Sequence, residues 1–431
     1  MKAKRIVSIL LTGSMLLSLL PVSALAATPV FDAPAQTTAK KAAPLVQEAD
    51  ASRSTEEEAA TRSSRDLDAE NNTAESITID LDAKGNPTSQ GDVAHWYYNA
   101  TALFLNSGTF TLQPSSDPEA ASALQADLDI GGAAEFNSGT VGRRAYNEGT
   151  ISDGTFQGEV HNWGTISNGT FQREVHNWGT ISDGIFQQPV DNHKTISGGT
   201  FQQPVNNYKT ISGGTFWEGV EVNASSGENA TIEGGTFERT IVLMNGDASI
   251  TIKDGLFDGE VVTGGCASPL SITGGLFTKA VAVSSITPDK LSITGGYFVD
   301  KPALPEGSNI AFTTVSDQNG GNFQVPVNDG FSDSYTSLFV PSGSSEQPNT
   351  ITVKTNTKLL YYLADDERVP VLDSDRDSYV YKIPVQNYEK IVLVTEEPSA
   401  PPTDNPGELD PAFSSGAAAL GVVLGLSLIH I

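Results

Sequence analysis

The central part of the chain repeats itself every 15 residues. An isoleucine, a phenylalanine and a valine recur at that spacing. They are Ile151, Ile166, Ile181, Ile196 and Ile211; Phe156, Phe171, Phe186, Phe201 and Phe216; and Val160, Val175, Val190, Val205 and Val220. One unit of this length cannot bury these side chains alone, but stacked units can bury them in continuous columns. Because the units are rich in β-branched residues and broken by Gly and Asn, the repeat predicts a β-solenoid with coils about 4.8 Å apart.

The repeat unit then lengthens to 20 or 21 residues. Its isoleucines are Ile232, Ile252, Ile272 and Ile293, and each is followed by a Gly-x-Phe sequence. A new apolar residue stands two positions before each isoleucine, as an extended strand requires. We therefore expect an all-β fold: a single-chain parallel β-helix over residues 136–305, with an N-terminal cap and the first coils over residues 77–135.

Polar residues follow the same 15-residue period. One set is predicted to stack as an amide ladder at a corner of the coils: Asn147, Asn162, Asn177, Asn192 and Asn207. A second set, Thr150 to Thr210, is expected to face outward beside the isoleucines. Such a threonine ladder also suggests ice binding, although the neighbouring serines and the interrupting charges weaken that interpretation.

The segments that flank the repeats differ in composition. Residues 308–395 contain short alternating apolar runs, which predict a small β-domain, a sandwich in our interpretation. Residues 27–76 are acidic and Ala-rich with few large apolar side chains, so we expect a disordered spacer. Residues 396–413 contain five prolines and are expected to form an extended linker.

The two ends suggest export and an incomplete C-terminus. Residues 1–26 combine a basic start, an apolar run and an Ala-x-Ala site, which is typical of a signal peptide, so we expect an extracellular or cell-surface protein. Residues 414–431 read as the start of a truncated apolar segment. Its last six residues match the translation of a transposon end used in sequencing libraries, and we expect them to be artefactual. Membrane or wall attachment would then depend on the missing C-terminus.

Composition excludes several classes of function. The chain has 25 Lys and Arg against 52 Asp and Glu, a formal net charge of −27. This balance disfavours a nucleic-acid partner, because no basic excess can neutralise phosphates. The single cysteine, Cys266, excludes a disulfide scaffold and any multi-cysteine metal site. No phosphate-binding or dinucleotide motif predicts a cofactor. The acidic loop that begins at Asp373 lacks the Gly and Glu of an EF-hand, as Ser378 and Pro384 stand in their places.

The Ser-Gly-Gly-Thr-Phe units at residues 197–201 and 212–216, behind a signal peptide, resemble those of β-helical, adhesin-like surface proteins of Gram-positive bacteria. This resemblance covers about residues 100–305 and implies a fold similar to the pectin-lyase-like β-helix. It is specific for architecture rather than activity, since that fold serves lyases, hydrolases and adhesins. The sequence contains no Leu-Pro-x-Thr-Gly sorting motif, which leaves wall anchorage open.

The strongest candidate site repeats on two adjacent 15-residue coils. The candidate residues are Glu159, His161 and Trp163, their equivalents Glu174, His176 and Trp178, and the later aromatics His193 and Tyr208. If the valines point inward, these side chains share one outer face. Flat aromatics beside hydrogen-bonding groups suit sugar rings. The competing interpretation is a purely structural aromatic ladder. A metal site built from the two Glu and two His is disfavoured, because a flat sheet face seldom makes ligands converge, and we expect no bound metal.

These observations predict a non-catalytic β-helix that is adhesin-like, structural or glycan-binding, with a polysaccharide, a host glycan or the cell wall as partner. The alternative is a polysaccharide lyase or glycoside hydrolase on the same fold. Asp153 and Asp183 occupy one turn column two coils apart, about 9.6 Å, near the carboxylate separation of inverting glycosidases. Turn formation by Asp explains the same residues, so we assign no catalytic residue.

Overall fold

The computed structural model describes residues 76–397, apart from residues 225, 226, 245, 266, 267, 319, 321 and 372–377. The predicted signal peptide, spacer (up to residue 75), linker (from residue 398) and C-terminal apolar segment therefore lie outside the described residues. Cys266 and residues 373–377 of the acidic loop lie outside them as well. The described chain is all-β, with one 3-10 turn, η1 (Pro288–Lys290), which confirms the predicted fold class. In this part of the chain no helix is long and apolar enough to cross a membrane.

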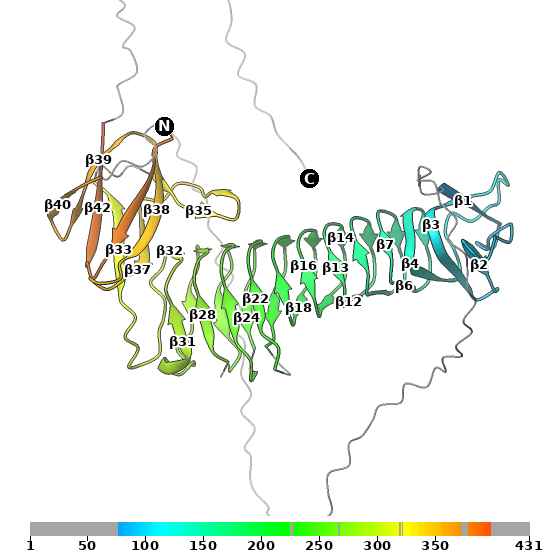
Figure 1. Cartoon of the computed structure of the whole chain (residues 1–431), viewed down its shortest axis with the longest axis horizontal. Coiled ribbons are helices and arrows are strands. Elements are labelled where there is room, and N and C mark those ends of the chain that lie inside the picture. Colours follow the sequence, from blue (N-terminus) through cyan, green and yellow to red (C-terminus); the bar gives the residue numbers. More distant parts are fainter. Residues whose placement is uncertain are drawn as a thin grey trace, which may run out of the picture. The chain divides into compact units, whose positions relative to one another are not determined.

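Each regular coil of the solenoid consists of three short strands that follow the three apolar columns (Figure 1). The isoleucine strands are β7 (Thr150–Ile151), β10 (Thr165–Ile166), β13 (Thr180–Ile181), β16 (Thr195–Ile196), β19 (Thr210–Ile211), β22 (Ala230–Ile232), β25 (Ile250–Ile252), β28 (Leu270–Ile272) and β31 (Leu291–Ile293). The phenylalanine strands are β5 (Thr140–Val141), β8 (Thr155–Phe156), β11 (Thr170–Phe171), β14 (Ile185–Phe186), β17 (Thr200–Phe201), β20 (Thr215–Phe216), β23 (Thr236–Phe237), β26 (Leu256–Phe257), β29 (Leu276–Phe277) and β32 (Tyr297–Phe298). The valine strands are β6 (Ala145–Asn147), β9 (Val160–Asn162), β12 (Val175–Asn177), β15 (Val190–Asn192), β18 (Val205–Asn207), β21 (Val220–Val222), β24 (Ile241–Leu243), β27 (Val261–Thr263) and β30 (Val281–Ala282).

Equivalent residues of successive coils pair in parallel and in register. In the isoleucine strands Ile166 pairs with Ile181, and in the phenylalanine strands Phe171 pairs with Phe186. The same holds for the valine strands, whose register places identical positions directly above one another. This pairing confirms the predicted parallel solenoid and explains why one short unit can repeat, since each coil uses its neighbour as a template.

The phenylalanine column forms the centre of the core. From Phe156 to Phe298 consecutive rings stack with centroids 4.5–5.1 Å apart and interplanar angles of 4–8°. All of these rings are buried. Burial of one such side chain contributes about 1.5–3 kcal/mol, so stability comes from the column as a whole and grows coil by coil.

The predicted amide ladder is also confirmed. The side chains of Asn147, Asn162, Asn177, Asn192 and Asn207 are fully buried. The Nδ2 of each of the first four donates to the Oδ1 of the next asparagine at 2.6–2.7 Å. A buried amide without hydrogen-bond partners would destabilise the folded state, but each interior asparagine of the ladder forms hydrogen bonds with both of its neighbours. At the start of the ladder, Asn147 Oδ1 has no hydrogen-bond partner among the described residues.

Glycine is required at the turn that precedes each phenylalanine strand. Gly169 adopts a φ of +128°, which L-residues with a side chain rarely adopt. A Cβ atom there would lie 3.1 Å from the carbonyl oxygen of Gly154 on the preceding coil. The Gly of the Ser-x-Gly turn therefore serves both the backbone conformation and the close approach of the coils.

Longer strands cover the N-terminal end of the solenoid. They are β1 (Ser76–Leu81), β2 (Trp96–Tyr98), β3 (Ala102–Pro114) and β4 (Asp127–Ser138). β3 pairs in parallel with both β4 and β1, whereas β2 pairs with it in the antiparallel direction. Trp96, which pairs with Leu105 of β3, is buried and belongs to the same apolar core as the coils. This arrangement covers sheet edges that would otherwise invite association with other chains.

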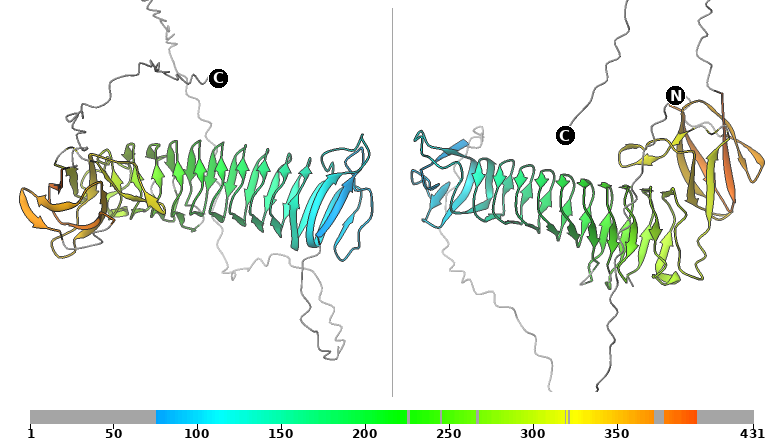
Figure 2. Two further views of the ribbon diagram at one scale, coloured as in Figure 1. Left: turned by 90° about the horizontal axis from the view of Figure 1, so that it is seen from above. Right: turned by 180° about the vertical axis from the view of Figure 1, so that it is seen from behind.

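The C-terminal strands form two facing layers and continue the solenoid (Figure 2). The first layer contains β33 (Phe312–Asp317), β37 (Ser337–Pro341), β39 (Leu359–Ala364), β40 (Glu367–Pro370) and β42 (Lys390–Thr395). The second contains β34 (Phe323–Gln324), β38 (Asn349–Thr355) and β41 (Val380–Val385), and β35 (Pro326–Val327) forms a hairpin with β36 (Gly330–Phe331). The two layers share one apolar core, as in the sandwich-like domain expected from the sequence.

Specific contacts join these strands to the last coils. β37 pairs with β32, which extends the phenylalanine sheet of the solenoid into the C-terminal strands. The hydroxyl of Tyr297 donates to the carbonyl oxygen of Thr352 at 3.1 Å and accepts from its backbone N–H at 3.0 Å. The Asn328 side chain accepts a hydrogen bond from the backbone N–H of Gly235 at 2.9 Å. The C-terminal strands thus cover the end of one solenoid sheet.

Candidate functional site

The structure brings all four predicted aromatic residues together. Trp163, Trp178, His193 and Tyr208 follow the valine strands β9, β12, β15 and β18 at one corner of the coils. Their ring centroids are successively 5.2, 5.3 and 4.6 Å apart, and the interplanar angles are 5–10°. We call these four residues the aromatic stack.

This geometry determines how the aromatic stack can meet a ligand. Because the rings lie face to face, the faces inside the stack are covered by neighbouring rings. The indoles of Trp163 and Trp178 are nevertheless 47% and 37% exposed. Trp178 is stacked on both faces, between Trp163 and His193, whereas Trp163 is the end ring of the stack. Ring edges offer C–H groups and the indole N–H to a sugar rather than a flat apolar face. The stack also stabilises the coils, as the competing structural interpretation expects.

A second column of rings lies on the outward position of the adjacent valine strands. Tyr146, His161 and His176 stack with centroids 5.3 and 5.1 Å apart, and we call them the histidine column. Glu159 Oε1 lies 2.9 Å from His161 Nε2 and 3.3 Å from His176 Nε2. Asp191 Oδ2 lies 3.1 Å from His176 Nδ1. Carboxylates therefore connect the imidazoles of successive coils.

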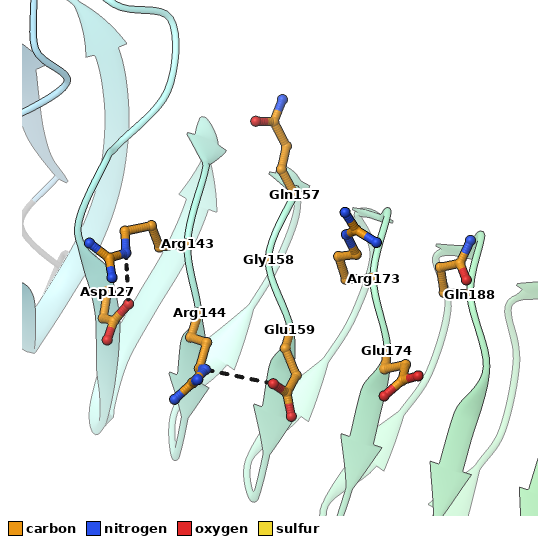
Figure 3. A pocket seen from close by; sticks show the side chains of 9 residues that line it. All are labelled: Asp127, Arg143, Arg144, Gln157, Gly158, Glu159, Arg173, Glu174 and Gln188. Atoms are coloured by element: carbon orange, nitrogen blue, oxygen red, sulfur yellow. Dashed lines mark ion pairs between the residues drawn. The ribbon is translucent and has the colours of Figure 1, made fainter.

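The turns that precede the valine strands form a hollow of about 510 Å³ (Figure 3). We call it the arginine groove, and its lining residues are Asp127, Arg143, Arg144, Gln157, Gly158, Glu159, Arg173, Glu174 and Gln188. Arg143 Nε lies 3.5 Å from Asp127 Oδ1. Arg144 Nε lies 3.6 Å from Glu159 Oε2. The predicted residue Glu174 is exposed and belongs to this groove rather than to the carboxylates that contact the histidine column.

Neighbouring groups perturb several titratable side chains on this flank. The hydroxyl of Tyr146, 3.5 Å from Arg144 Nη1, together with the charge of Glu159, raises the pKa of the Arg144 guanidinium. Burial, followed by the charge of Glu148, raises the pKa of the Asp129 carboxyl. Arg144 therefore stays a permanent cation at the boundary between the groove and the histidine column.

The arginine groove was not predicted from the sequence. Its signal is a column at the 15-residue period, but the residue changes from each coil to the next: Arg143, Gly158, Arg173 and Gln188. A repeat is recognised by identical residues at equivalent positions, whereas here equivalent positions of successive coils carry different side chains. An alignment of the coils by column, rather than by conserved motif, would have placed Arg143 and Arg173 on one side of the solenoid.

The other sequence candidates do not form a reactive site among the described residues. Asp153 Oδ1 and Asp183 Oδ1 each accept the backbone N–H of the next residue, at 2.7 and 2.8 Å, as expected for turn formation. No group of three or more Asp, Glu, His or Cys side chains in this part of the chain is arranged to hold a metal ion. No protein-family model, curated protein or solved structure matches this chain.

Proposed function

We propose that the chain is an exported, non-catalytic surface protein whose solenoid binds polysaccharide along one flank. One observation carries this proposal: Glu159 lines the arginine groove and also contacts both imidazoles of the histidine column. The ring centroids of His161 and Trp163, and of His176 and Trp178, are 6.0 Å apart, which connects the histidine column to the aromatic stack. The groove, the histidine column and the aromatic stack therefore adjoin one another on one surface, which we call the binding flank.

The chemistry of the binding flank suits a sugar polymer. Guanidinium, amide and indole N–H groups donate hydrogen bonds, carboxylates accept them, and the aromatic edges present C–H groups to sugar oxygens. Positions 143, 158, 173 and 188 lie on successive coils, so the groove extends about 14 Å along the solenoid axis. A groove that crosses several coils suits a stretch of linear polymer better than a single small molecule.

The architecture supports a role outside the cell. A stack of identical coils with a continuous aromatic core forms a rigid support. The predicted signal peptide and the resemblance to adhesin-like surface proteins both favour display at the cell surface. The net charge of −27 favours solubility of an exported protein and says little about its ligand.

The enzymatic alternative has weaker support. A lyase or glycosidase requires an acid and a base that converge on the substrate, with separations set by the reaction. Asp153 and Asp183, the pair that suggested such chemistry, instead accept hydrogen bonds from their own turns. Release of reducing ends or unsaturated products from a polysaccharide would nevertheless favour the enzyme.

The proposal predicts that the full chain is retained on an array of neutral and acidic polysaccharides. Replacing both stacked indoles, Trp163→Ala and Trp178→Ala, should lower retention by about tenfold or more, since buried aromatic contacts dominate such interfaces. The matched control is Trp217→Ala, because Trp217 is similarly exposed (45%) but stands outside the stack and the groove.

Circular dichroism and thermal unfolding of each variant separate lost binding from lost folding. Folded double-variant protein with reduced retention, together with unchanged retention of the Trp217 variant, supports the binding flank. Unchanged retention of a folded double variant rejects the aromatic stack as a binding element and leaves it as a structural ladder. No retention of the wild-type chain on any polysaccharide refutes the proposed function.

A further inference from the structure

The arginine groove is electrostatically unusual for this chain. Three of the five arginines in the described residues line it, although the whole chain carries a net charge of −27. Arg143 and Arg144 each face a carboxylate, Asp127 and Glu159 respectively. Arg173 is exposed and forms no ion pair with any described residue. One guanidinium in the groove is therefore available to an external anion.

The backbone produces a gap beside this guanidinium. Arg143 and Arg173 occupy equivalent positions two coils apart, about 9.6 Å along the axis, with Gly158 between them. A Cβ atom on Gly158 would lie 2.1 Å from the carbonyl oxygen of Arg143, so only glycine fits at this position. In Figure 3, Gly158, which has no side chain, lies on the coil between those of Arg143 and Arg173. An anionic group that enters this gap meets the Arg173 guanidinium, whereas the Arg143 guanidinium is directed toward Asp127 (Figure 3).

The second row of the groove limits the charge of the ligand. It contains the carboxylates of Asp127, Glu159 and Glu174, which equal the three arginines in number. These carboxylates can accept hydrogen bonds from sugar hydroxyls. They would repel a polymer that carries an acid on every unit, because like charges at close range cost free energy in a partly desolvated site. The groove therefore suits isolated anions between neutral units.

We infer that the arginine groove recognises a linear glycan that carries isolated carboxylate groups, each flanked by neutral, hydroxyl-bearing sugars. Arg173 is the contact for the carboxylate, which enters the gap beside Gly158. A planar guanidinium matches a carboxylate in bidentate geometry, which gives orientation as well as affinity. This inference rests on the proposed glycan binding and specifies its ligand class.

The test measures binding of the full chain by calorimetry to three probes. They are hyaluronan oligosaccharides, in which acidic and neutral sugars alternate, the same oligosaccharides after reduction of their carboxyl groups, and polygalacturonate oligosaccharides of matched length. We expect the alternating acid to bind best. Carboxyl reduction should lower affinity by about tenfold or more, the usual effect of losing a charged hydrogen-bond partner. Affinity for the alternating acid should also fall with rising ionic strength.

Two matched variants locate the contact. Arg173→Gln removes the charge and keeps a polar, hydrogen-bonding side chain, although a shorter one, so it should abolish the preference for the acidic over the reduced oligosaccharide. Arg239→Gln is the control, because Arg239 is an exposed arginine of the same column that lies outside the groove. It should leave the preference unchanged.

The outcomes separate the inference from the proposed function. Equal affinity for the acidic and reduced probes, or an unaltered preference in Arg173→Gln, overturns the inference while glycan binding stands. Tighter binding of polygalacturonate overturns the claim that isolated carboxylates are preferred. Failure to bind any probe or any polysaccharide of the array overturns the proposed function and the inference with it.

Discussion

Replacement of Asn177 by Ala tests how the amide ladder stabilises the solenoid. Asn177 lies in the middle of the ladder and is fully buried. Its Nδ2 donates to Asn192 Oδ1 at 2.7 Å, and its Oδ1 accepts from Asn162 Nδ2 at the same distance. Its Nδ2 also lies 3.1 Å from the carbonyl oxygens of Gly179 and Thr195. Alanine removes all of these contacts at once and leaves their partners buried.

The expected loss follows from the number of orphaned partners. A buried polar group without a partner costs about 1–3 kcal/mol. Asn162 loses its ladder acceptor and Asn192 loses its ladder donor, so Asn177→Ala should lower the free energy of unfolding by about 2–6 kcal/mol. Urea unfolding followed by circular dichroism measures this change. Hydrogen exchange should place the largest loss of protection in the two adjacent coils, since solenoid coils interact mainly with their neighbours.

The first member of the ladder provides the control. Asn147 donates to Asn162 Oδ1 at 2.6 Å, but its own Oδ1 has no partner among the described residues. Asn147→Ala therefore orphans one ladder partner and removes one unsatisfied acceptor, so its cost should be at most about 1–3 kcal/mol. Equal losses for the two variants would show that the ladder hydrogen bonds do not set the stability, and the reasoning would be wrong.

Two further predictions concern pH. Burial raises the pKa of Tyr297 to about 12 from an ordinary value of 10.0, so the folded state holds this proton more tightly than the unfolded chain. The stabilisation of the folded state by this proton is fully present below pH 10 and is lost as pH rises towards 12, a fall in the free energy of unfolding of roughly 2–3 kcal/mol. Tyr297→Phe should abolish this fall in urea unfolding measured across the same pH range. An identical pH profile for both proteins contradicts the assignment. Burial, assisted by the charge of Asp329, also raises the pKa of the Asp254 carboxyl. Ionisation of this carboxyl at neutral pH therefore lowers the stability of the folded state. Asp254→Asn should raise the melting temperature at neutral pH and lose that advantage in acid, where wild-type Asp254 binds its proton. The control is Asp153→Asn, because Asp153 is exposed at the equivalent turn of another coil. A similar shift of the melting temperature in both variants refutes the reasoning.

Much of the fold follows from the period of the sequence. The 15-residue spacing places Phe171 above Phe156 and Asn177 above Asn162. Burial, ring stacking and the amide ladder therefore all follow from this period. The same spacing places Trp163 and Trp178 on one corner of the coils. Equivalent residues of stacked coils lie next to one another, so these columns could be predicted without knowledge of the turns.

Features that depend on three-dimensional geometry could not be predicted in this way. The period places the aromatic rings in a row, but only the structure shows that their faces cover one another. The arginine groove arises from unlike residues in one column, and the gap at Gly158 depends on the close approach of two turns. The contact between Tyr297 and Thr352 joins segments that no repeat relates. Each depends on side-chain orientation or on distant parts of the chain.

The coil length also explains where the binding flank ends. In the 15-residue coils only two residues separate the end of β18 at Asn207 from the start of β19 at Thr210. In the next coil β21 ends at Val222 and β22 begins at Ala230, so the insertion falls on the corner that carries the aromatic stack. The amide ladder stops at the same place, because Val222 offers Asn207 no amide partner. Equal short corners keep the rings and amides of successive coils in register. The longer coils lack the aromatic stack and the amide ladder and instead carry an additional apolar column. A ligand that follows the aromatic stack should therefore contact only the 15-residue coils.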